Sequence, residues 1–261
     1  MRFLEEIISK KWEEVAERQK RFSIKDLKTR ENYTRISHSL VQRLKNSNGP
    51  GIIMEFKRKS PSKGFINEMA KVSEVIPGYI NAGATGISIL TDEQFFGGSL
   101  SDLEEAHLIS DIPLLRKDFV IHPYQVFETK AYGADVILLI AECLEKNELQ
   151  DLHDLAREIG LEALVELHHE KELEKMPQGQ QLLGVNNRNL NSFEVNLETS
   201  VNIIKHLPEG IELVSESGIS RPETIKELWK LGYSGFLMGE YFMKAGNPAK
   251  AALDFKKQIE A

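Results

Sequence analysis

The chain has 261 residues, of which 33 are Lys or Arg and 40 are Asp or Glu, so its formal net charge is −7. Apolar residues make up 41% and charged residues 28% of the chain, a composition that excludes an intrinsically disordered protein. The acidic balance argues against nucleic acid or a membrane surface as a partner. The longest apolar runs, such as residues 136–141, are far shorter than the roughly 20 residues that a membrane span needs. The one cysteine, Cys143, excludes an intramolecular disulfide and favours the reducing cytoplasm.

Residues 1–50 predict helices that precede a repeating core, and charges interrupt this segment too often for a signal peptide. Four side chains with helical spacing share one face, which we expect to be buried: Leu4, Ile8, Trp12 and Val15. The sequence 48–50, Asn-Gly-Pro, is typical of a turn and ends the segment. Its role, as a lid, a wall of a substrate site or a plug under the rest of the fold, stays open at this stage.

From residue 51 onward, short β-branched apolar runs alternate with amphipathic stretches, the pattern of parallel strands covered by helices on both sides. We expect strands at residues 51–57, 86–91, 112–117, 135–140, 162–166, 182–186, 211–216 and 235–238. Each interval has room for a loop, a helix and a return loop. Eight such units predict a closed (β/α)8 barrel over residues 51–261, with residues 1–50 as a helical extension of the same domain. An open doubly wound sheet would need a glycine-rich phosphate loop after its first strand, where this chain has Lys57 and Ser60.

Polar residues and glycines stand at or just beyond the C-terminal ends of six predicted strands: Glu55, Lys57, Lys117, Glu166, Asn186, Arg188, Glu216, Ser217, Gly218 and Gly239. An outward-facing strand residue packs under a helix and should be apolar, so we expect the charges to face the barrel lumen or its rim. The C-terminal strand ends converge on one mouth, which is where such barrels carry out chemistry. Carboxylates and lysines that meet there predict shifted pKa values, with lysine as proton donor and glutamate as acceptor. The alternative is a solvated rim of structural salt bridges.

Two loops carry features of a phosphate site, because backbone N–H groups after strands seven and eight bind phosphate in many barrels. Ser217-Gly218 and Gly239-Glu240 allow close approach of the backbone, and we expect the following helix N-terminus to add a favourable dipole. Ser60 could add a hydroxyl from the first loop. The alternative is that these are ordinary loop glycines. Phe96 and Phe119 could enclose a planar ring at the same mouth, or only pack their own loops.

The histidines and the cysteine predict no further site. Adjacent His168 and His169 point apart in a helix or a strand, so we expect a solvated pair and no metal. The chain has no P-loop, no G-x-G-x-x-G after a strand and no H-E-x-x-H, which disfavours nucleotide binding and a zinc protease. Cys143 follows a strand without a conspicuous base, which favours a structural thiol.

Seven short motifs follow one another along the chain. They are Glu55-x-Lys57-x-x-Ser60-Pro61-Ser62, Leu90-Thr91-Asp92 with Phe96-Gly97-Gly98-Ser99, Leu115-Arg116-Lys117-Asp118-Phe119, Leu164-Val165-Glu166, Gly184-Val185-Asn186-Asn187-Arg188-Asn189-Leu190, Ser215-Glu216-Ser217-Gly218-Ile219 and the run from Gly235 to Glu240. Together and in this order they resemble the indole-3-glycerol-phosphate synthase family, the cofactor-free (β/α)8 lyases of tryptophan biosynthesis. The resemblance covers nearly the whole chain, including the N-terminal helical extension.

The resemblance implies an enzyme that converts 1-(2-carboxyphenylamino)-1-deoxyribulose 5-phosphate into indole-3-glycerol phosphate, carbon dioxide and water, with no cofactor. It implies Lys117 as the general acid on the ketone oxygen and Glu166 as the proton acceptor in the dehydration step. Lys57 would bind an anionic group of the substrate and could also donate the proton in dehydration, and Glu55 would orient Lys57 and tune its charge. Which lysine serves which proton transfer stays open.

Supporting roles follow from the same resemblance. Hydroxyl positioning and support of the acid–base pair would fall to Asn186, Glu216 and Ser217, with Arg188 at the rim. Phosphate binding would fall to Ser60, Gly218, Gly239 and Glu240, and enclosure of the ring to Phe96, Phe119 and Leu138. The loop at residues 62–68 could close over the substrate or form a static connection.

Other activities on a phosphate-binding barrel are the main alternatives. A phosphoribosylanthranilate isomerase would carry a Cys/Asp acid–base pair, and Cys143 has no evident partner. A Schiff-base aldolase would be trapped on its lysine by borohydride, and an inactive scaffolding barrel is disfavoured by the intact set of charged residues at the strand ends. We expect a monomer or weak homo-oligomer, and association with other tryptophan-pathway enzymes stays open.

Overall fold

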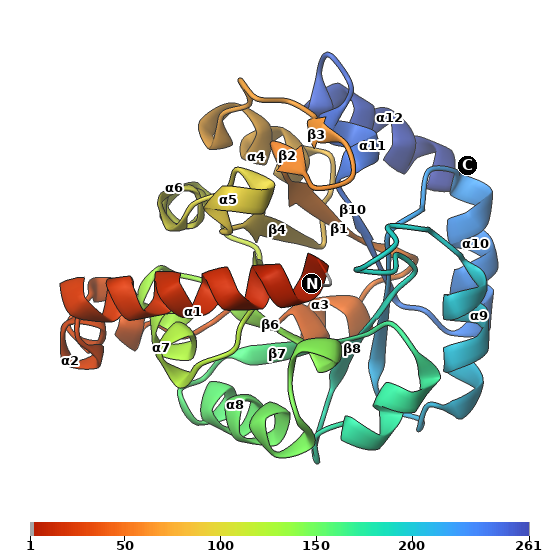
Figure 1. Ribbon diagram of the computed structural model, residues 1–261. Coiled ribbons are helices and arrows are strands. Elements are labelled where there is room, and N and C mark those ends of the chain that lie inside the picture. The colour runs from red at the N-terminus through yellow and green to blue at the C-terminus, as the bar shows by residue number, and fades with distance from the viewer. Residues whose placement is uncertain (1–2, 261) are drawn as a thin grey trace.

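A computed structural model describes residues 3–260. Eight parallel strands form a closed barrel in the order β1-β10-β9-β8-β7-β6-β5-β4 (Figure 1). They are β1 (Gly51–Phe56), β4 (Gly86–Leu90), β5 (Leu114–Lys117), β6 (Val136–Ile140), β7 (Glu162–Leu167), β8 (Leu182–Asn186), β9 (Glu212–Glu216) and β10 (Gly235–Met238). The predicted (β/α)8 barrel is therefore confirmed, because the apolar runs of the sequence are the strands that the barrel buries on both faces.

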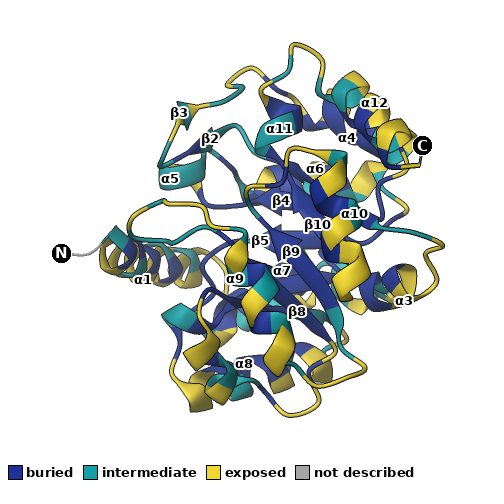
Figure 2. Cartoon of the chain, turned by 90° about the vertical axis from the view of Figure 1, so that its right-hand side faces the viewer, coloured by how far each residue is buried: buried dark blue, intermediate teal, exposed yellow. Residues whose placement is uncertain are grey.

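Helices cover the outside of the barrel, with buried inner faces and exposed outer faces (Figure 2). The longer ones are α4 (Val72–Asn81), α6 (Leu100–Ile109), α7 (Pro123–Ala131), α8 (Lys146–Glu158), α9 (Glu198–Ile203), α10 (Pro222–Leu231) and α12 (Pro248–Glu260). Short helices follow several strands: α5 (Glu93–Phe96), η2 (Ala141–Cys143), η3 (Glu170–Lys175) and α11 (Glu240–Met243). A further short helix, η4 (Ile204–His206), continues α9. Between β7 and β8 the connection carries only η3. Within the described residues, no helix has the length and apolar character to cross a membrane.

Two apolar layers hold the barrel together. Neighbouring residues of one strand point to opposite faces, so Ile52 packs in the layer between strands and helices while Ile53 packs in the lumen. Leu115, Leu138 and Leu164 join Ile53 inside the barrel. Within residues 3–260 the lumen is therefore filled by side chains, and a cavity opens at the C-terminal ends of the strands.

Residues 3–50 lie against both ends of the barrel. They form α1 (Phe3–Arg21), α2 (Ile24–Lys28), η1 (Glu31–Thr34) and α3 (Leu40–Lys45). Leu44 of α3 lies where strands begin, so that a Cβ on Gly51 would come within 2.6 Å of its Cδ2 atom. Phe3 and Ile7 of α1 instead line a cavity at the opposite end, where the strands finish. The extension is thus a plug at the bottom and a wall at the mouth.

The face that α1 buries differs from the expected one. The buried residues are Leu4, Ile7, Lys11 and Val15, whereas Trp12 is 48% exposed. Lys11 is buried because three carboxylates from α1 and from two loops of the barrel surround its ammonium group. Apolar periodicity could not place a lysine on the inner face, since its partners come from distant parts of the chain.

A second expectation, that outward-facing strand residues are apolar, is wrong at Arg116. Its side chain is completely buried on the outer face of β5, next to α7. The guanidinium group lies 3.0 Å from Asp118 Oδ2 and 2.8 Å from Glu128 Oε2, and it donates to Thr91 Oγ1. Two ion pairs and several hydrogen bonds offset the cost of removing this charge from water.

The loop after β1 contains a short hairpin, which the sequence did not predict. Strand β2 (Lys59–Ser60) pairs antiparallel with β3 (Gly64–Phe65), and Gly64 adopts the left-handed φ of 67° that the turn requires. The carbonyl oxygen of Arg58 accepts hydrogen bonds from the backbone N–H groups of Ile66 and Asn67. These bonds fix the base of the hairpin beside the mouth of the barrel.

Candidate active site

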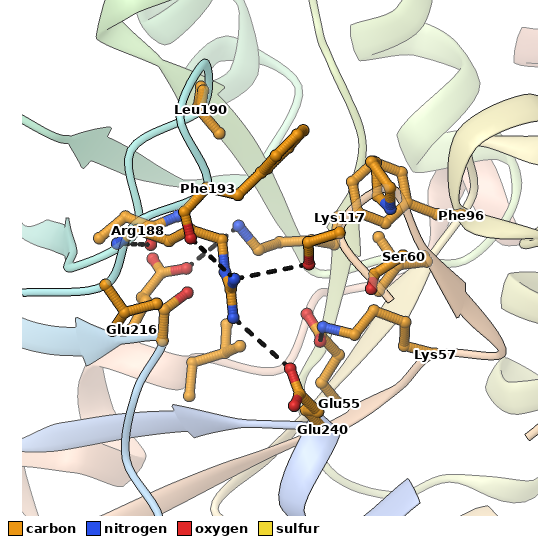
Figure 3. Close-up of a pocket in the computed structure, with 18 of the residues that line it drawn as sticks. Glu55, Lys57, Ser60, Phe96, Lys117, Arg188, Leu190, Phe193, Glu216 and Glu240 are labelled. Atoms are coloured by element: carbon orange, nitrogen blue, oxygen red, sulfur yellow. Dashed lines mark hydrogen bonds and ion pairs between the residues drawn. The ribbon is translucent and has the colours of Figure 1, made fainter. Parts of the chain in front are cut away.

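A cavity of about 610 Å³ opens at the C-terminal ends of the barrel strands. Its lining includes every residue that the sequence nominated: Glu55, Lys57, Ser60, Phe96, Lys117, Phe119, Leu138, Glu166, Asn186, Arg188, Glu216, Ser217, Gly218, Gly239 and Glu240. Figure 3 shows the charged side chains among them turned toward one another from different strands and loops. The strand ends converge because the barrel is closed, so residues more than 100 positions apart share one space.

Lys117 lies at the centre of the deepest group of charges. Its Nζ contacts Glu166 Oε2 and lies 3.1 Å from Glu216 Oε2. These three side chains come from the ends of β5, β7 and β9 and point into the lumen. One ammonium group therefore lies between two carboxylates.

The shared charge sets the protonation state of each group. Burial alone would lower the pKa of Lys117, but Glu166 and Glu216 raise it well above its usual value. Burial and the neighbouring Glu166 raise the pKa of Glu216 well above 4.5. Burial would raise the pKa of Glu166 too, yet Lys117 holds it well below that value. The arrangement provides a protonated lysine beside an ionised glutamate, a proton donor and a proton acceptor in contact.

Glu55 and Lys57 form a second pair on β1 and just beyond its end. Lys57 Nζ lies 2.6 Å from Glu55 Oε1, and Figure 3 shows the two side chains together at the cavity wall. Gly239 makes room for this pair, because a Cβ at that position would fall 2.8 Å from Glu55 Cβ and closer still to its carboxylate. Gly239 is therefore required by the packing of Glu55.

Asn186 connects the deep cluster to the rim. Its Nδ2 donates to Glu166 Oε1 at 3.1 Å, and its Oδ1 accepts from the backbone N–H of Arg188 at 3.0 Å. The Arg188 side chain then reaches across the mouth, where Nη2 lies 3.5 Å from Glu240 Oε2 (Figure 3). The Glu240 carboxylate is thus turned to Arg188.

Other residues of the cavity lining have the features of an anion cradle. Ser217 and Gly218 adopt left-handed φ values of 66° and 78°, and at Ser217, which is not glycine, this conformation is strained. Ser60 Oγ is buried and has no hydrogen-bond partner within residues 3–260. The helix after Gly239, α11, has only four residues, so the dipole that we expected there is weak.

Apolar side chains form the remaining wall. The rings of Phe96 and Phe119 lie 6.1 Å apart, tilted by 40°, with Leu138 in the same lining. The sequence did not nominate Phe3 and Ile7 of α1, because nothing in the local pattern places the N-terminal helix at the mouth. Leu190 and Phe193, on the loop after β8, also line the cavity.

Residues 4–255 match the family model described as indole-3-glycerol phosphate synthase. The chain belongs to this family. The indole-3-glycerol phosphate synthase of Bacteroides thetaiotaomicron is 45% identical over 257 residues, which cover 98% of each chain. That of Acidovorax sp. is 40% identical over 256 residues, covering 95% of this chain and 96% of the relative. Members of this synthase family are carbon–carbon lyases that release carbon dioxide, so the chain is an enzyme of that class.

Solved structures with low sequence identity share the barrel. KGPDC from Streptococcus mutans aligns with a TM-score of 0.60 at 15% identity, over 82% of this chain and 98% of that one. A thiamine phosphate pyrophosphorylase from Pyrococcus furiosus aligns with a TM-score of 0.59 at 18% identity, over 85% and 98%. At these identities the likeness shows only that the chains share a fold. The chemistry of this chain has to be inferred from the residues that line its cavity.

His168 corrects the expectation of a solvated histidine pair. In this member of the synthase family its side chain is 1% exposed, and Nε2 lies 3.2 Å from Glu166 Oε1. The residue follows the end of β7, two positions beyond Glu166. The spacing of two along an extended chain was the available signal, since it places both side chains on one side of the backbone.

Proposed function

We propose that the chain converts 1-(2-carboxyphenylamino)-1-deoxyribulose 5-phosphate into indole-3-glycerol phosphate, carbon dioxide and water. The observation that carries this proposal is the contact of Lys117 with Glu166 at the floor of a cavity that has an anion cradle on one side and aromatic rings on another. The substrate has a phosphate, an aromatic ring, a carboxylate and a ketone, and each finds a complementary group in that cavity.

Lys117 is the general acid of ring closure in this proposal. The ring carbon that carries the carboxylate attacks the ketone carbon, and Lys117 Nζ gives its proton to the ketone oxygen as the new carbon–carbon bond forms. Loss of carbon dioxide returns an electron pair to the ring and restores its aromaticity. Because Glu166 and Glu216 raise the pKa of Lys117, the ammonium form that this step needs is fully populated at neutral pH.

Glu166 accepts the proton that leaves during dehydration. The new hydroxyl departs as water after it is protonated, and the proton removed from the substrate passes to the Glu166 carboxylate. Lys57 is placed to supply the proton to the leaving hydroxyl or to hold an anionic group, and Glu55 orients Lys57 through their 2.6 Å contact. Asn186, Glu216 and Ser217 position the hydroxyl groups and the acid–base pair.

The two ends of the substrate are bound by different walls. The phosphate contacts the backbone at Gly218, Gly239 and Glu240 and the Ser60 hydroxyl, which lacks a partner within the described chain. The aromatic ring lies against Phe96, Phe119 and Leu138. Arg188 supports the rim, because it donates to the carbonyl oxygen of Phe193 in its own loop and contacts Glu240 in the loop after β10.

Two features disfavour the other barrel activities. A Schiff-base aldolase needs an unprotonated lysine, whereas the carboxylates around Lys117 keep its pKa well above the usual value. An isomerase of the phosphoribosylanthranilate type would need a cysteine in the cavity, and Cys143 is outside the lining that the described residues form.

We further propose that residues 1–261 act as one domain in the cytoplasm, as a monomer or weak homo-oligomer.

A fluorescence assay for the indole product tests the activity. The purified wild-type chain, incubated with the carboxyphenylamino substrate, should form indole-3-glycerol phosphate without added cofactor. A chain that forms no indole product contradicts the proposal. Covalent trapping of the substrate on a lysine by borohydride would favour the aldolase instead.

A further inference from the structure

His168 lies behind the proposed base, on the side away from the cavity. Its Nε2 lies 3.2 Å from Glu166 Oε1, while Lys117 contacts the other carboxylate oxygen, Oε2. The cavity lining includes Glu166 and Lys117 but not His168. The Glu166 carboxylate is therefore held between an ammonium group that faces the substrate and an imidazole ring that does not.

Three acidic residues from three elements surround the His168 ring. Nδ1 lies 3.9 Å from Glu142 Oε2 in η2, and Nε2 faces Glu166 at the end of β7. Glu172 of η3 accepts the backbone N–H groups of His168 and His169 at 2.6 and 3.1 Å. These bonds fix the backbone at His168 and so restrict the direction in which its ring can point.

The other titratable groups near this cluster do not compete for the ring. Cys143 of η2 is close to the same carboxylates, and burial together with Glu166 raises the pKa of its thiol, which keeps it neutral. Lys175 of η3 donates to the carbonyl oxygens of Ala141 and Leu144. The surplus of acidic groups favours a protonated imidazole ring.

The charges agree with this geometry. Burial alone would lower the pKa of His168, but Glu166, Glu172 and Glu142 raise it above 6.5. In turn, Lys117 and His168 together hold the pKa of Glu166 well below 4.5, although burial would raise it. A buried carboxylate that lost both cations would take up a proton and could no longer act as a base.

We propose that His168 is a positioning residue for the proposed reaction: its ring orients Glu166 and keeps that carboxylate ionised when Lys117 turns to the ketone oxygen. Lys117 cannot donate its proton to the substrate and still neutralise Glu166 fully. His168 stays in place because it is buried behind the cavity and its backbone is bonded to Glu172. The role of His168 in turnover rests on the proposed function. The pairing of His168 with Glu166 does not depend on that function.

Kinetics of His168→Asn test the role in turnover. We expect kcat to fall by about tenfold with a smaller change in KM, and the acidic limb of kcat/KM to move to higher pH, because Glu166 loses a neighbouring cation. His168→Gln, which keeps a donor of greater reach, should restore part of kcat. A folded His168→Asn enzyme with the wild-type kcat and pH profile would overturn the inference. His206→Asn is the matched control, because His206 also lies 3.2 Å from a glutamate, Glu170, but is half exposed and remote from the cavity.

A titration of the histidine rings by NMR tests the pairing without turnover. In the wild-type chain the His168 ring should stay protonated above pH 6.5, and Glu166→Gln should lower its pKa. A neutral His168 ring at pH 7, or one that does not respond to Glu166→Gln, would overturn the inference even if His168→Asn fails to fold. A wild-type chain without synthase activity would contradict the proposed function alone, and the titration would then decide the pairing by itself.

Discussion

Lys11 Nζ lies 2.8 Å from Asp118 Oδ1, a contact that joins the N-terminal helix to the residue directly after Lys117. The same ammonium group lies 2.9 Å from Asp92 Oδ2 and 2.6 Å from Glu14 Oε2. Because Asp92 and Asp118 belong to the loops after β4 and β5, this buried cluster holds α1 against the mouth of the barrel. The N-terminal helix is therefore part of the wall of the cavity, which Phe3 and Ile7 line.

Replacing Lys11 by methionine should destabilise the fold. The substitution keeps the volume of the side chain but leaves Asp118 and Asp92 buried with one cation fewer, a change that costs about 3–5 kcal/mol for a buried ion pair. Urea unfolding at pH 7 measures this loss. KM should rise as well, since Phe3 and Ile7 lie on the same helix and line the cavity. Lys10→Met, at an exposed position on α1, is the control and should change neither value.

The contribution of this cluster should depend on pH in a defined direction. Burial would raise the pKa of Asp118, but Lys11 and Arg116 hold it well below 3.8. A depressed folded-state pKa stabilises the fold above the unfolded value and loses that effect as pH falls through the folded value. The stability difference between wild type and Lys11→Met should be constant at neutral pH and shrink below about pH 4. A difference that grows in acid would contradict the assignment.

Gly239→Ala should impair catalysis through Glu55. A Cβ at this position would overlap the Glu55 side chain, which must then move and release Lys57. A displacement of this kind near reacting groups can cost about 10²-fold in kcat/KM. Gly246→Ala is the matched control, because a Cβ there meets no atom of the described chain within 4 Å. Equal activity of the two variants would show that the Glu55–Lys57 geometry is not needed.

Gly218→Ala should weaken binding of the phosphate more than it slows the chemical steps. Its φ of 78° is unfavourable for alanine, and the new Cβ would press on Val195, so the turn that presents the backbone N–H groups must change. We expect KM to rise by about tenfold with a smaller change in kcat, the signature of lost ground-state binding. Gly210→Ala has similar backbone strain at φ 86° without a clash, and it should leave KM unchanged.

The strands and the residues of the mouth could be predicted because their signal is local. The apolar run at 136–140 and the charge at Lys117 each stand in a few consecutive residues, and the closed barrel then brings the strand ends together. Once eight strands are predicted to close into a barrel, the residues at their C-terminal ends are expected to share one cavity. This prediction does not require knowledge of which distant residues are in contact.

The buried position of Lys11 could not be predicted, because its partner Asp118 is distant in the sequence. His168 meets Glu142 only after the β6 and β7 loops are adjacent, although its spacing of two from Glu166 was a local signal. Arg116 likewise depends on Glu128 from the next helix. A charged residue in an apolar pattern predicts exposure by default, and only the tertiary structure shows which one is neutralised inside.

The turnover number of Lys117→Met, followed by the fluorescence of the indole product, tests the central claim most directly. Methionine preserves the packing beneath the cavity but removes the proton donor next to Glu166 and Glu216. Loss of the general acid predicts a fall in kcat of roughly 10²–10⁴ relative to wild type, while Lys71→Met at an exposed position stays at the wild-type value. A folded Lys117→Met enzyme that keeps kcat within a few-fold of wild type would contradict the assignment of Lys117.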